Sequence, residues 1–392
     1  MSADARKFDV AIVGGGPAGT SAAIALAIAG ARVLVLERSG YEDPRIGEML
    51  PPVAKSVLAR LGVWEMFVAA GHRPTPAVLS AWGAPHPISR EAIFDPNGSG
   101  WHLDRRAFDA MLAGAAETAG ASVWRHARLV GLSGQSGAWR LDVIDDGRAV
   151  ELSAAVIVDA TGRAATWARR LGGAAQTYDA LVGVVGTVEA ASWTARQSDA
   201  DANGESRVPT DVTAIEAIAD GWWYSAPLPD GSLVVTFMTD ADLLPRDDRR
   251  GDSAWRAALA LSDLTRRRCG PMPRFVRDVR VVSARSQSLC PAAGDGWFAV
   301  GDAALAMDPL SSGGVVEALL SGLGAAAAIV SGQSSASLDY ETALRQRVVR
   351  YLKSRQSHYA RETRWQRSAF WSRRQSDARG FGVTERDQPR AP

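Results

Sequence analysis

The sequence predicts a mixed α/β fold in which one domain is interrupted by another. Three observations predict it. A strand, a helix and a second strand follow one another within the first 37 residues. Between about residues 173 and 279 the chain carries β-branched runs bounded by turn residues, which are typical of an antiparallel sheet. Spaced aromatic and charged residues between 351 and 374 predict a helical C-terminus.

Length and charge limit the kind of protein that this chain can be. It has 392 residues, 46% hydrophobic and 22% charged, which suffices for two or three domains of about 150 residues each. Its 44 basic and 43 acidic side chains give a net charge of +1, which argues against a nucleic-acid partner. Only Lys7, Lys55 and Lys353 are lysines, so almost every cationic contact must come from arginine.

Composition also predicts a cytoplasmic protein without a metal site. Cys269 and Cys290 form neither a metal-ligand cluster nor a disulfide framework, which suits a reducing compartment. The first strand begins near Phe8, which leaves no room for a signal peptide. Glycine and serine interrupt every long apolar run, so we expect no membrane partner.

The first 37 residues form a complete βαβ unit. A β-branched strand at 8–13 stops at a glycine-rich turn, a helix of small residues follows at 20–29, and a buried strand at 31–36 ends in Glu37. The turn has the sequence GGGPAG at 14–19, which is the G-x-G-x-x-G spacing of a Rossmann-like dinucleotide site.

Each glycine of that motif has a mechanical role. Gly14 permits the tight turn, Gly16 lets the backbone approach a pyrophosphate, and Gly19 lets the helix pack on the strand. The pyrophosphate then lies at the helix N-terminus, where free N–H groups favour anions. Glu37, eighteen residues beyond Gly19, is placed to accept hydrogen bonds from an adenosine ribose. The motif alone leaves both NAD and FAD open.

Later segments resemble, in order and spacing, the flavoprotein hydroxylases of the para-hydroxybenzoate-hydroxylase-like fold. They are HLDRRAFD at 102–109, VIVDATGR at 156–163, WFAVGDAA at 297–304 and DPLSSGG at 308–314, the last followed by an apolar helix to Ile329. The resemblance covers the chain from Asp9 to about Ile329. It implies a Rossmann-like FAD-binding domain and FAD as the cofactor.

The resemblance assigns cofactor contacts residue by residue. It implies that Asp302 binds the ribityl chain, with a helix N-cap as the alternative role. Arg105 would donate to cofactor phosphates or ribityl oxygens. Gly313 and Gly314 would direct N–H groups at the flavin pyrimidine and stabilise negative charge there, a catalytic role. The implied cofactor contacts also include Pro17, Ala18, Arg38, Arg45, Leu129 and Pro309.

Two segments indicate a branch of that family. RIGEMLPP at 45–52 is similar to the Gly-Glu segment of tryptophan halogenases and related hydroxylases, which makes Glu48 a catalytic candidate, with a solvated loop carboxylate as the alternative. From Trp222 the chain has W-x-Y-x-A-P where halogenases carry W-x-W-x-I-P. Trp222, Trp223 and Tyr224 are candidates for an apolar wall that stacks an aromatic substrate, and ordinary core aromatics are the alternative.

One residue that halogenases carry, a lysine, is absent from the corresponding region of this chain. Halogenases carry one on the strand region that follows the Gly-Glu segment, where it is held to carry or orient hypohalous acid. Residues 57–90 of this chain contain no lysine, and arginine cannot form the same chloramine-like species. Halogenation is therefore disfavoured.

The aromatic and arginine residues at 351–374 are similar to the tail of flavoproteins that mature quinone-cofactor oxidases and amine dehydrogenases. Those flavoproteins are thought to hydroxylate a tryptophan held within a partner protein. The alternative is an amphipathic closing helix whose aromatic residues pack on the FAD domain. Both interpretations can hold together.

The predicted domains are discontinuous. The segments are 1–72, 100–172 and 280–330 for the FAD-binding domain, 73–99 and 173–279 for a substrate domain built on an antiparallel sheet, 331–374 for a helical C-terminal segment, and 375–392 for a disordered tail.

The resemblance implies an FAD-dependent monooxygenase that hydroxylates an electron-rich aromatic group through a flavin C4a-hydroperoxide. The substrate would be a peptide- or protein-bound tryptophan or a small molecule, with a partner protein in the first case. Electrons would come from NAD(P)H directly or through a flavin reductase. A flavin-dependent halogenase, an isoprenoid-type reductase and a non-catalytic FAD-binding chaperone stay open as alternatives.

Overall fold

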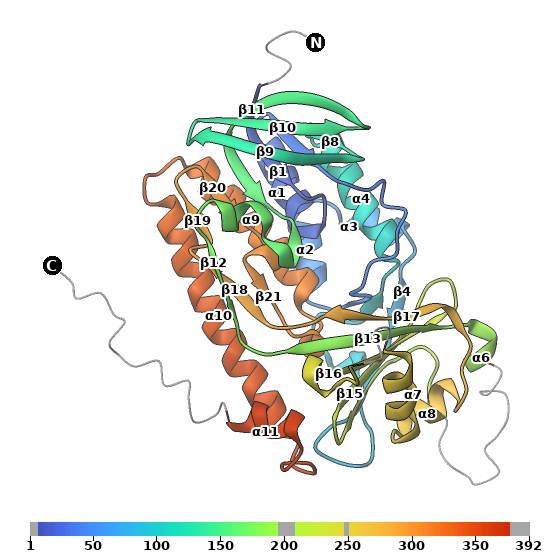
Figure 1. Cartoon of the computed structure of the whole chain (residues 1–392). Coiled ribbons are helices and arrows are strands. Elements are labelled where there is room, and N and C mark those ends of the chain that lie inside the picture. The colour runs from blue at the N-terminus through green and yellow to red at the C-terminus, as the bar shows by residue number, and fades with distance from the viewer. Residues whose placement is uncertain (1–6, 195–207, 247–250, 377–392) are drawn as a thin grey trace.

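The computed structural model describes residues 7–194, 208–246 and 251–376 (Figure 1). It contains two large sheets, which we call the first sheet (upper in Figure 1) and the second sheet (lower). Of the predicted tail at 375–392, only the first two residues are described, at the end of the last helix. The rest of that prediction lies outside the described residues.

The first sheet is built mainly on parallel strands. Its strands are β1 (Lys7–Val13), β2 (Val33–Leu36), β8 (Ser122–Trp124), β9 (Ala127–Gln135), β10 (Ala138–Asp145), β11 (Arg148–Asp159), β19 (Ala293–Gly294) and β20 (Trp297–Ala299). They run in the order β19–β20–β11–β1–β2–β8, with the β9–β10 hairpin added to β11. Because β2, β1, β11 and β20 are parallel, their carboxyl ends meet at one edge.

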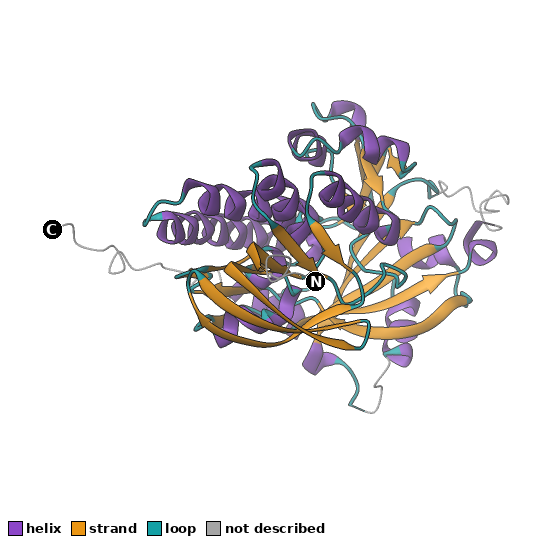
Figure 2. Cartoon of the chain, turned by 90° about the horizontal axis from the view of Figure 1, so that it is seen from above, coloured by secondary structure: helices purple, strands orange, loops and turns teal. Residues whose placement is uncertain are grey.

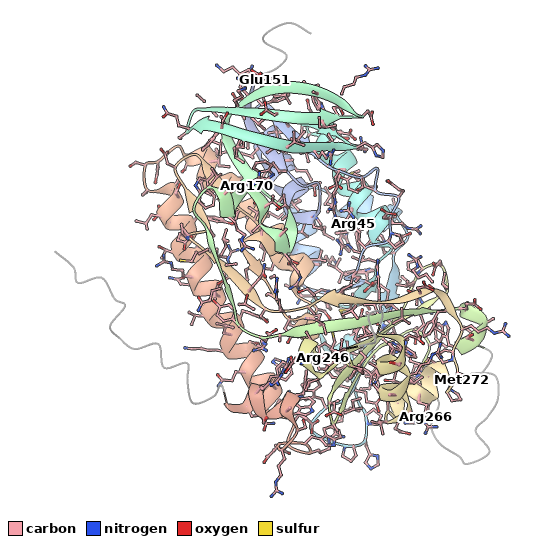
Figure 3. All side chains as sticks on the ribbon, viewed as in Figure 1. Arg45, Glu151, Arg170, Arg246, Arg266 and Met272 are labelled. Carbon is pink, nitrogen blue, oxygen red and sulfur yellow. The ribbon has the colours of Figure 1, made fainter. Side chains whose placement is uncertain are left out.

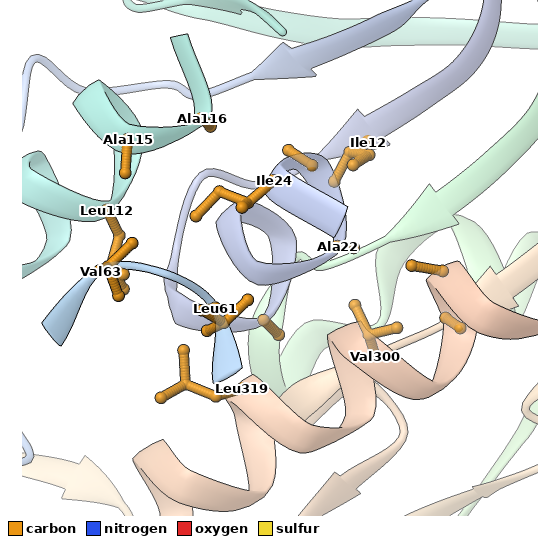
Figure 4. Close-up of a cluster of buried hydrophobic side chains, with 14 of the residues drawn as sticks. Ile12, Ala22, Ile24, Leu61, Val63, Leu112, Ala115, Ala116, Val300 and Leu319 are labelled. Carbon is orange, nitrogen blue, oxygen red and sulfur yellow. The ribbon is translucent and has the colours of Figure 1, made fainter. Parts of the chain in front are cut away.

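Helices α1 (Pro17–Ile28), α4 (Arg105–Thr118) and α9 (Gly314–Ser331) cover one face of the first sheet (Figure 2). Ile12 of that sheet and Val300, which directly follows β20, belong to the same apolar cluster as Ile24 and Leu319 of the helices (Figure 4). Small residues bring α1 and α9 close together, since a Cβ at Gly322 would lie 2.3 Å from a main-chain oxygen of α1. The other face is covered by a second cluster that includes β9, β10 and α5 (Thr166–Arg170).

Helix α9 is the one helix within the described residues that is long and apolar enough to cross a membrane. It has 18 residues and a mean hydropathy of 1.7. In this structure it packs against α1 in the core of the first domain. Buried core helices commonly have this composition, so the apolarity of α9 has an explanation in packing alone.

The second sheet is almost wholly antiparallel, as predicted. Its strands, in spatial order, are β17 (Phe275–Ser283), β13 (Leu181–Val188), β16 (Leu233–Asp240), β15 (Gly221–Pro227), β14 (Thr213–Ile218), β5 (Ala77–Ala81) and β6 (Ile88–Glu91). Only β14 and β5 pair in parallel. The strands come from the segments predicted for the substrate domain, although β17 extends beyond residue 279.

One face of the second sheet packs on short helices. α7 (Asp252–Ala260) and α8 (Leu264–Cys269) cover it, and α6 (Ala190–Thr194) adds Trp193. Trp223 and Trp255 meet edge to face there, with ring centroids 5.1 Å apart. The opposite face, which carries Trp222 and Tyr224, is turned towards the C-terminal helices.

Small elements connect the two sheets. They are β3 (Met49–Leu50), β4 (Arg73–Thr75) and β7 (Gly100–His102) in one three-stranded sheet, β12 (Ala174–Thr177), β18 (Gln287–Cys290) and β21 (Leu305–Ala306) in another, the helices α2 (Ala54–Arg60) and α3 (Trp64–Ala69), and the 3₁₀ turns η2 (Ala92–Phe94), η3 (Gly162–Ala164), η5 (Ala241–Leu243), η6 (Gly301–Ala303) and η7 (Pro309–Ser311).

The C-terminal helices join the two sheets and correct one expectation. α10 (Ala336–Ala360) runs along one side of the molecule from the first sheet to the second, and α11 (Ala369–Ser376) follows it (Figure 1). Tyr359, Phe370 and Trp371 are fully buried, but in one cluster with Trp222 and Met238 of the second sheet. Most aromatic residues of this segment therefore pack on the second sheet, and Tyr351 packs against the second apolar cluster of the first sheet.

Candidate cofactor and active site

The glycine-rich turn lies between β1 and α1, at the carboxyl edge of the first sheet. Gly14 has a φ of +112°, and a Cβ there would lie 2.2 Å from the carbonyl oxygen of Ala160. A Cβ on Gly19 would lie 2.0 Å from the carbonyl oxygen of Gly14. Only glycine fits these two positions, because any larger residue would displace backbone.

Gly16 is different from the other two glycines of the motif. Its backbone is extended, with φ −76° and ψ −178°, and it is the N-cap of α1 without a side-chain cap. A Cβ at Gly16 would have no heavy atom within 4 Å. Pro17 and Ala18 follow as the first helical residues. Open space therefore lies before an uncapped helix N-terminus, an arrangement that suits a phosphate group.

Glu37 follows β2 at the same edge and faces the glycine turn. Its Oε2 accepts a hydrogen bond of 2.9 Å from the Gly15 N–H. Its Oε1 accepts from the N–H and the hydroxyl of Ser39 and from Arg45 Nη2. Each carboxylate oxygen has two lone pairs, and Oε2 accepts a single hydrogen bond from the protein. Oε2 therefore keeps one for a sugar hydroxyl.

Arg45 and Arg105 are both held by Asp109, which has no exposed surface. Arg45 Nη1 donates to Asp109 Oδ2 at 2.9 Å, and Arg105 donates to both carboxylate oxygens at 3.1 Å. We did not predict Asp109 as a site residue, although its position four residues after Arg105 on a helix gives the expected spacing for an ion pair. Figure 3 shows Arg45 between the two sheets.

Two predicted cofactor contacts stand apart from this group. Arg38 is exposed on the loop after β2. Leu129 lies in β9, and its side chain is buried in the core of the first sheet.

Asp302 lies in η6, directly after β20, at the carboxyl edge of the sheet. Its carboxylate does not cap a helix, so the N-cap alternative is not what the structure shows. Its Oδ2 lies 3.4 Å from Arg163 Nε, and 37% of the side chain is exposed. Arg163, which the VIVDATGR motif contains, also donates to the carbonyl oxygen of Met307. Asp302 thus has an oriented carboxylate with room for a further partner.

A second uncapped helix N-terminus lies near Asp302. Helix α9 begins at Gly314, with Gly313 as an N-cap that has no side-chain cap, and Pro309 begins the preceding turn η7. A Cβ at Gly314 would have no heavy atom within 4 Å. The Gly313 N–H makes only a long hydrogen bond of 3.4 Å to Ser311 Oγ, and contact of this helix start with the flavin pyrimidine stays a prediction.

Glu48 lines a cleft between the loop at 44–48, the start of α4 and the second sheet. Arg277 and Arg280 of β17 line the same cleft. The Glu48 side chain is buried, and its Oε2 accepts a hydrogen bond of 3.1 Å from the Gly47 N–H. Burial raises the pKa of the Glu48 carboxyl group, while Arg105 and Arg280 oppose this shift. A buried carboxyl group with a raised pKa is a candidate for proton transfer to or from a substrate.

The structure separates the two aromatic candidates of β15. Trp222 is completely buried, and its Nε1 donates to the Tyr359 hydroxyl at 3.0 Å. Tyr224 is half-buried, and within the described residues its hydroxyl has no hydrogen-bond partner although the oxygen itself is buried. Burial raises the pKa of Tyr224 well above its usual value, and the charge of Glu48 adds to the shift. Tyr224 and Glu48 are therefore electrostatic neighbours, whereas Trp222 is a core residue.

Comparison with known proteins identifies the family of this chain. A model of the FAD binding domain family matches residues 7–319. The chain belongs to this family. It is an FAD-dependent oxidoreductase of the halogenase and hydroxylase superfamily, with the α/β fold that the sequence predicts. The predictions of the family branch, the fold class and the FAD cofactor are confirmed.

Individual relatives include both halogenases and a hydroxylase. LodB of Marinomonas mediterranea, a proposed FAD-dependent oxidoreductase, is 29% identical over 376 residues, which cover 94% of this chain and 97% of LodB. The flavin-dependent halogenase CmlS has a TM-score of 0.81 and 26% identity, covering 94% of this chain and 67% of CmlS. The peptidyl tryptophan dihydroxylase QhpG, described as essential for tryptophylquinone cofactor biogenesis, has a TM-score of 0.73 and 25% identity over 94% of this chain and 79% of QhpG.

The residues at the carboxyl edge fit FAD. The open space at Gly16 suits the pyrophosphate, the spare lone pair of Glu37 suits the ribose, and the half-exposed Asp302 suits the ribityl hydroxyls. The roles of the individual site residues stay predictions, which single substitutions can test.

Gly16→Ala should fold like the wild type and bind FAD about tenfold more weakly, or about 1.4 kcal/mol. The new methyl group meets no protein atom but occupies the predicted path of the pyrophosphate. Its cost in unfolding free energy should stay within about 1 kcal/mol. Thermal unfolding of the apoprotein and an FAD titration measure the two effects. Gly19→Ala is the contrasting control, because its methyl group would clash with the backbone. This variant should lower both the unfolding free energy and the FAD affinity. Unchanged FAD affinity in folded Gly16→Ala would exclude a pyrophosphate at this helix.

Proposed function

We propose that this flavoenzyme is a monooxygenase that hydroxylates an electron-rich aromatic group, most simply a tryptophan side chain within a polypeptide. The observation that carries the proposal is Glu48, a buried carboxyl group with a raised pKa in the cleft between the two sheets. Hydroxylation of an aromatic ring releases a proton from the attacked carbon, and Glu48 would accept it. The similarity to QhpG, a peptidyl tryptophan dihydroxylase, over 94% of this chain supports a polypeptide substrate.

The chain's own residues provide binding, orientation and electrostatics. FAD would supply the oxygen-transfer chemistry when bound. The N–H groups at Gly313 and Gly314 would stabilise negative charge on the pyrimidine side of the cofactor. Arg45 and Arg105 are fixed by Asp109 before any ligand arrives, so that they need no reorganisation. The cleft beside Glu48 would hold the aromatic ring away from bulk water.

The test is a mass measurement on candidate polypeptides incubated with the holoenzyme, a reductant and oxygen. A gain of one or two oxygen atoms on a tryptophan, absent under anaerobic conditions, is the expected result. Co-purification with the products of neighbouring genes would supply the candidates. Product formation that does not depend on oxygen would exclude monooxygenation and point to a reductase. A stable complex that never turns over would point to a chaperone role.

Halogenation is the second candidate, favoured by the similarity to CmlS. Against it, none of the residues that line the Glu48 cleft is a lysine. Lys55, the lysine nearest to that loop in sequence, lies over the ring of Trp64, with 5.4 Å from its Nζ to the ring centroid. A product that requires bromide or chloride would establish halogenation and refute the hydroxylase proposal.

Electrons would reach FAD from NAD(P)H, directly or through a separate flavin reductase, and the reaction would take place in the cytoplasm with a partner protein as substrate. Anaerobic mixing of the holoenzyme with NADH or NADPH separates the two electron routes. Rapid bleaching of the flavin absorbance supports direct transfer. Bleaching only after a flavin reductase is added supports the indirect route.

Tyr224→Phe should leave the protein as stable as the wild type, because the deleted hydroxyl has no partner within the described residues. If this hydroxyl orients the substrate, the variant should release more hydrogen peroxide and less product per reduced flavin oxidised. Both quantities are measured in the same tube, and Tyr224→Ala serves as a comparison that also opens a void. An unchanged product-to-peroxide ratio in both variants would remove Tyr224 from the site.

A further inference from the structure

Two side chains on one face of α10 contact a single buried carboxylate, and a third contacts the main chain of the same residue. Tyr351, Arg355 and Tyr359 are spaced four residues apart, which places them on consecutive turns of the same helix face. The carboxylate belongs to Asp308, the residue that precedes η7 and opens the loop to Gly314. Asp308 and Tyr359 are both buried.

The contacts fix Asp308 from several directions. The Tyr359 hydroxyl donates to Asp308 Oδ2 at 2.7 Å, and Arg355 Nε lies 3.4 Å from the same oxygen. The Asp308 N–H donates to the Tyr351 hydroxyl at 2.7 Å. Asp308 Oδ1 in turn accepts from the Leu310 N–H at 2.9 Å, which fixes the first turn of the loop. Both the side chain and the main chain of Asp308 are thus held by α10.

The same three side chains also contact residues outside the loop 308–314. The Tyr359 hydroxyl accepts from Trp222 Nε1 in the second sheet, at 3.0 Å. Arg355 Nη2 lies 2.9 Å from a carboxylate oxygen of Asp179, just before β13. The Tyr351 hydroxyl bonds Ser286 Oγ at 2.6 Å. A continuous chain of hydrogen bonds therefore runs from Trp222 through Tyr359 to Asp308.

We infer that Tyr359 is a positioning residue, through which α10 and the second sheet set the loop 308–314 against the flavin. The inference rests on the predicted contact between this loop and the flavin pyrimidine, and it does not depend on which substrate is hydroxylated. The N–H groups of Gly313 and Gly314 move with the loop, so a change at Tyr359 changes the donors offered to the flavin. Tyr359 is fully buried, and Trp222 acts through it.

Tyr359→Phe tests this role in the holoenzyme. The variant removes one donor from Asp308 and one acceptor from Trp222, and keeps the ring in the aromatic cluster. We expect FAD to stay bound, with its dissociation constant raised about five- to tenfold. We also expect the visible absorption maxima and the reduction potential of bound FAD to shift. Trp222→Phe, which keeps the Tyr359–Asp308 bond, should shift both quantities less and in the same direction.

Tyr340→Phe is the matched control. Tyr340 is another buried tyrosine of α10, and its hydroxyl donates to the carbonyl oxygen of Ala299 at 2.7 Å. Tyr340→Phe loses a hydrogen bond of the same length as the Tyr359–Asp308 bond, but Tyr340 does not contact Asp308. The flavin spectrum and the reduction potential of this variant should therefore match those of the wild type. If Tyr359→Phe behaves like Tyr340→Phe, the inference is overturned. If Tyr359→Phe does not fold, an unshifted flavin in Trp222→Phe overturns it instead.

This outcome is separable from that of the proposed function. The flavin spectrum and potential are measured without a substrate. A shift in Tyr359→Phe together with no oxygenated polypeptide would refute the hydroxylase proposal and keep the positioning role. If the wild type oxygenates a polypeptide and Tyr359→Phe shows no spectral shift, the hydroxylase proposal is kept and the positioning role of Tyr359 is refuted.

Discussion

Replacing Glu48 with glutamine should lower the rate of product formation by about 10²- to 10⁴-fold, the usual contribution of a general acid or base. Glutamine keeps the shape of the side chain but cannot accept a proton. The pKa of the Glu48 carboxyl is raised by burial, so the fraction of ionised base grows as the pH rises through that elevated pKa. The wild-type rate should therefore rise with pH over this range, and Glu48→Gln should lose that dependence.

Folding stability should change in the opposite sense from activity. A carboxyl group whose pKa is raised in the folded state binds its proton more tightly there than in the unfolded chain. Its favourable contribution is present at low pH and is lost as the pH rises through the folded pKa. Above that pKa, Glu48→Gln should be at least as stable as the wild type. Glu42→Gln, a change of an exposed glutamate on the same loop, is the control that should alter neither property. A Glu48→Gln rate within a few fold of the wild type would exclude Glu48 as the base.

The sequence predicted those parts of the site that depend on local geometry. The glycine motif, Glu37 and Asp302 each follow a strand directly, and parallel strands bring such positions to one edge whatever the rest of the fold does. Gly14 and Gly19 were predictable because their backbone contacts come from within the βαβ unit or from the adjacent strand.

The contacts that the sequence did not predict all join distant segments. Trp222 is a core residue because Tyr359, 137 positions later, packs on it, and no periodicity in β15 could indicate this. Helix α10 crosses from the first sheet to the second, and this crossing determines on which sheet its aromatic residues pack (Figure 1). The spacing of Tyr351, Arg355 and Tyr359 did mark a helix face, but not the carboxylate that it holds. The four-residue spacing of Arg105 and Asp109 suits an ion pair on a helix, but only the fold shows that Arg45 shares Asp109.

Glu37→Lys should abolish FAD binding and destabilise the protein. The carboxylate is 5% exposed and receives hydrogen bonds from the Gly15 N–H, from Ser39 and from Arg45. Lysine removes all of these acceptors and places a second cation beside Arg45. Breaking one side of a buried ion pair typically costs about 3–5 kcal/mol, and we expect a loss of that size in the unfolding free energy.

Loss of FAD through unfolding alone must be separated from loss of the ribose contact. Glu37→Gln is the variant that does this, because it keeps an acceptor oxygen and introduces no charge. An amide oxygen supplies fewer acceptor sites than a carboxylate, so the Arg45 and Gly15 contacts compete with the ribose for it. We expect Glu37→Gln to remain folded and to bind FAD about tenfold or more weakly than the wild type, since hydrogen bonds to charged groups contribute about 1.5–3 kcal/mol. Titration with FAD and with free riboflavin, which lacks the adenosine, locates the effect: FAD affinity should fall while riboflavin affinity stays at the wild-type level. An equal fall for both ligands would show that Glu37 supports the fold of the turn and makes no contact with the ribose.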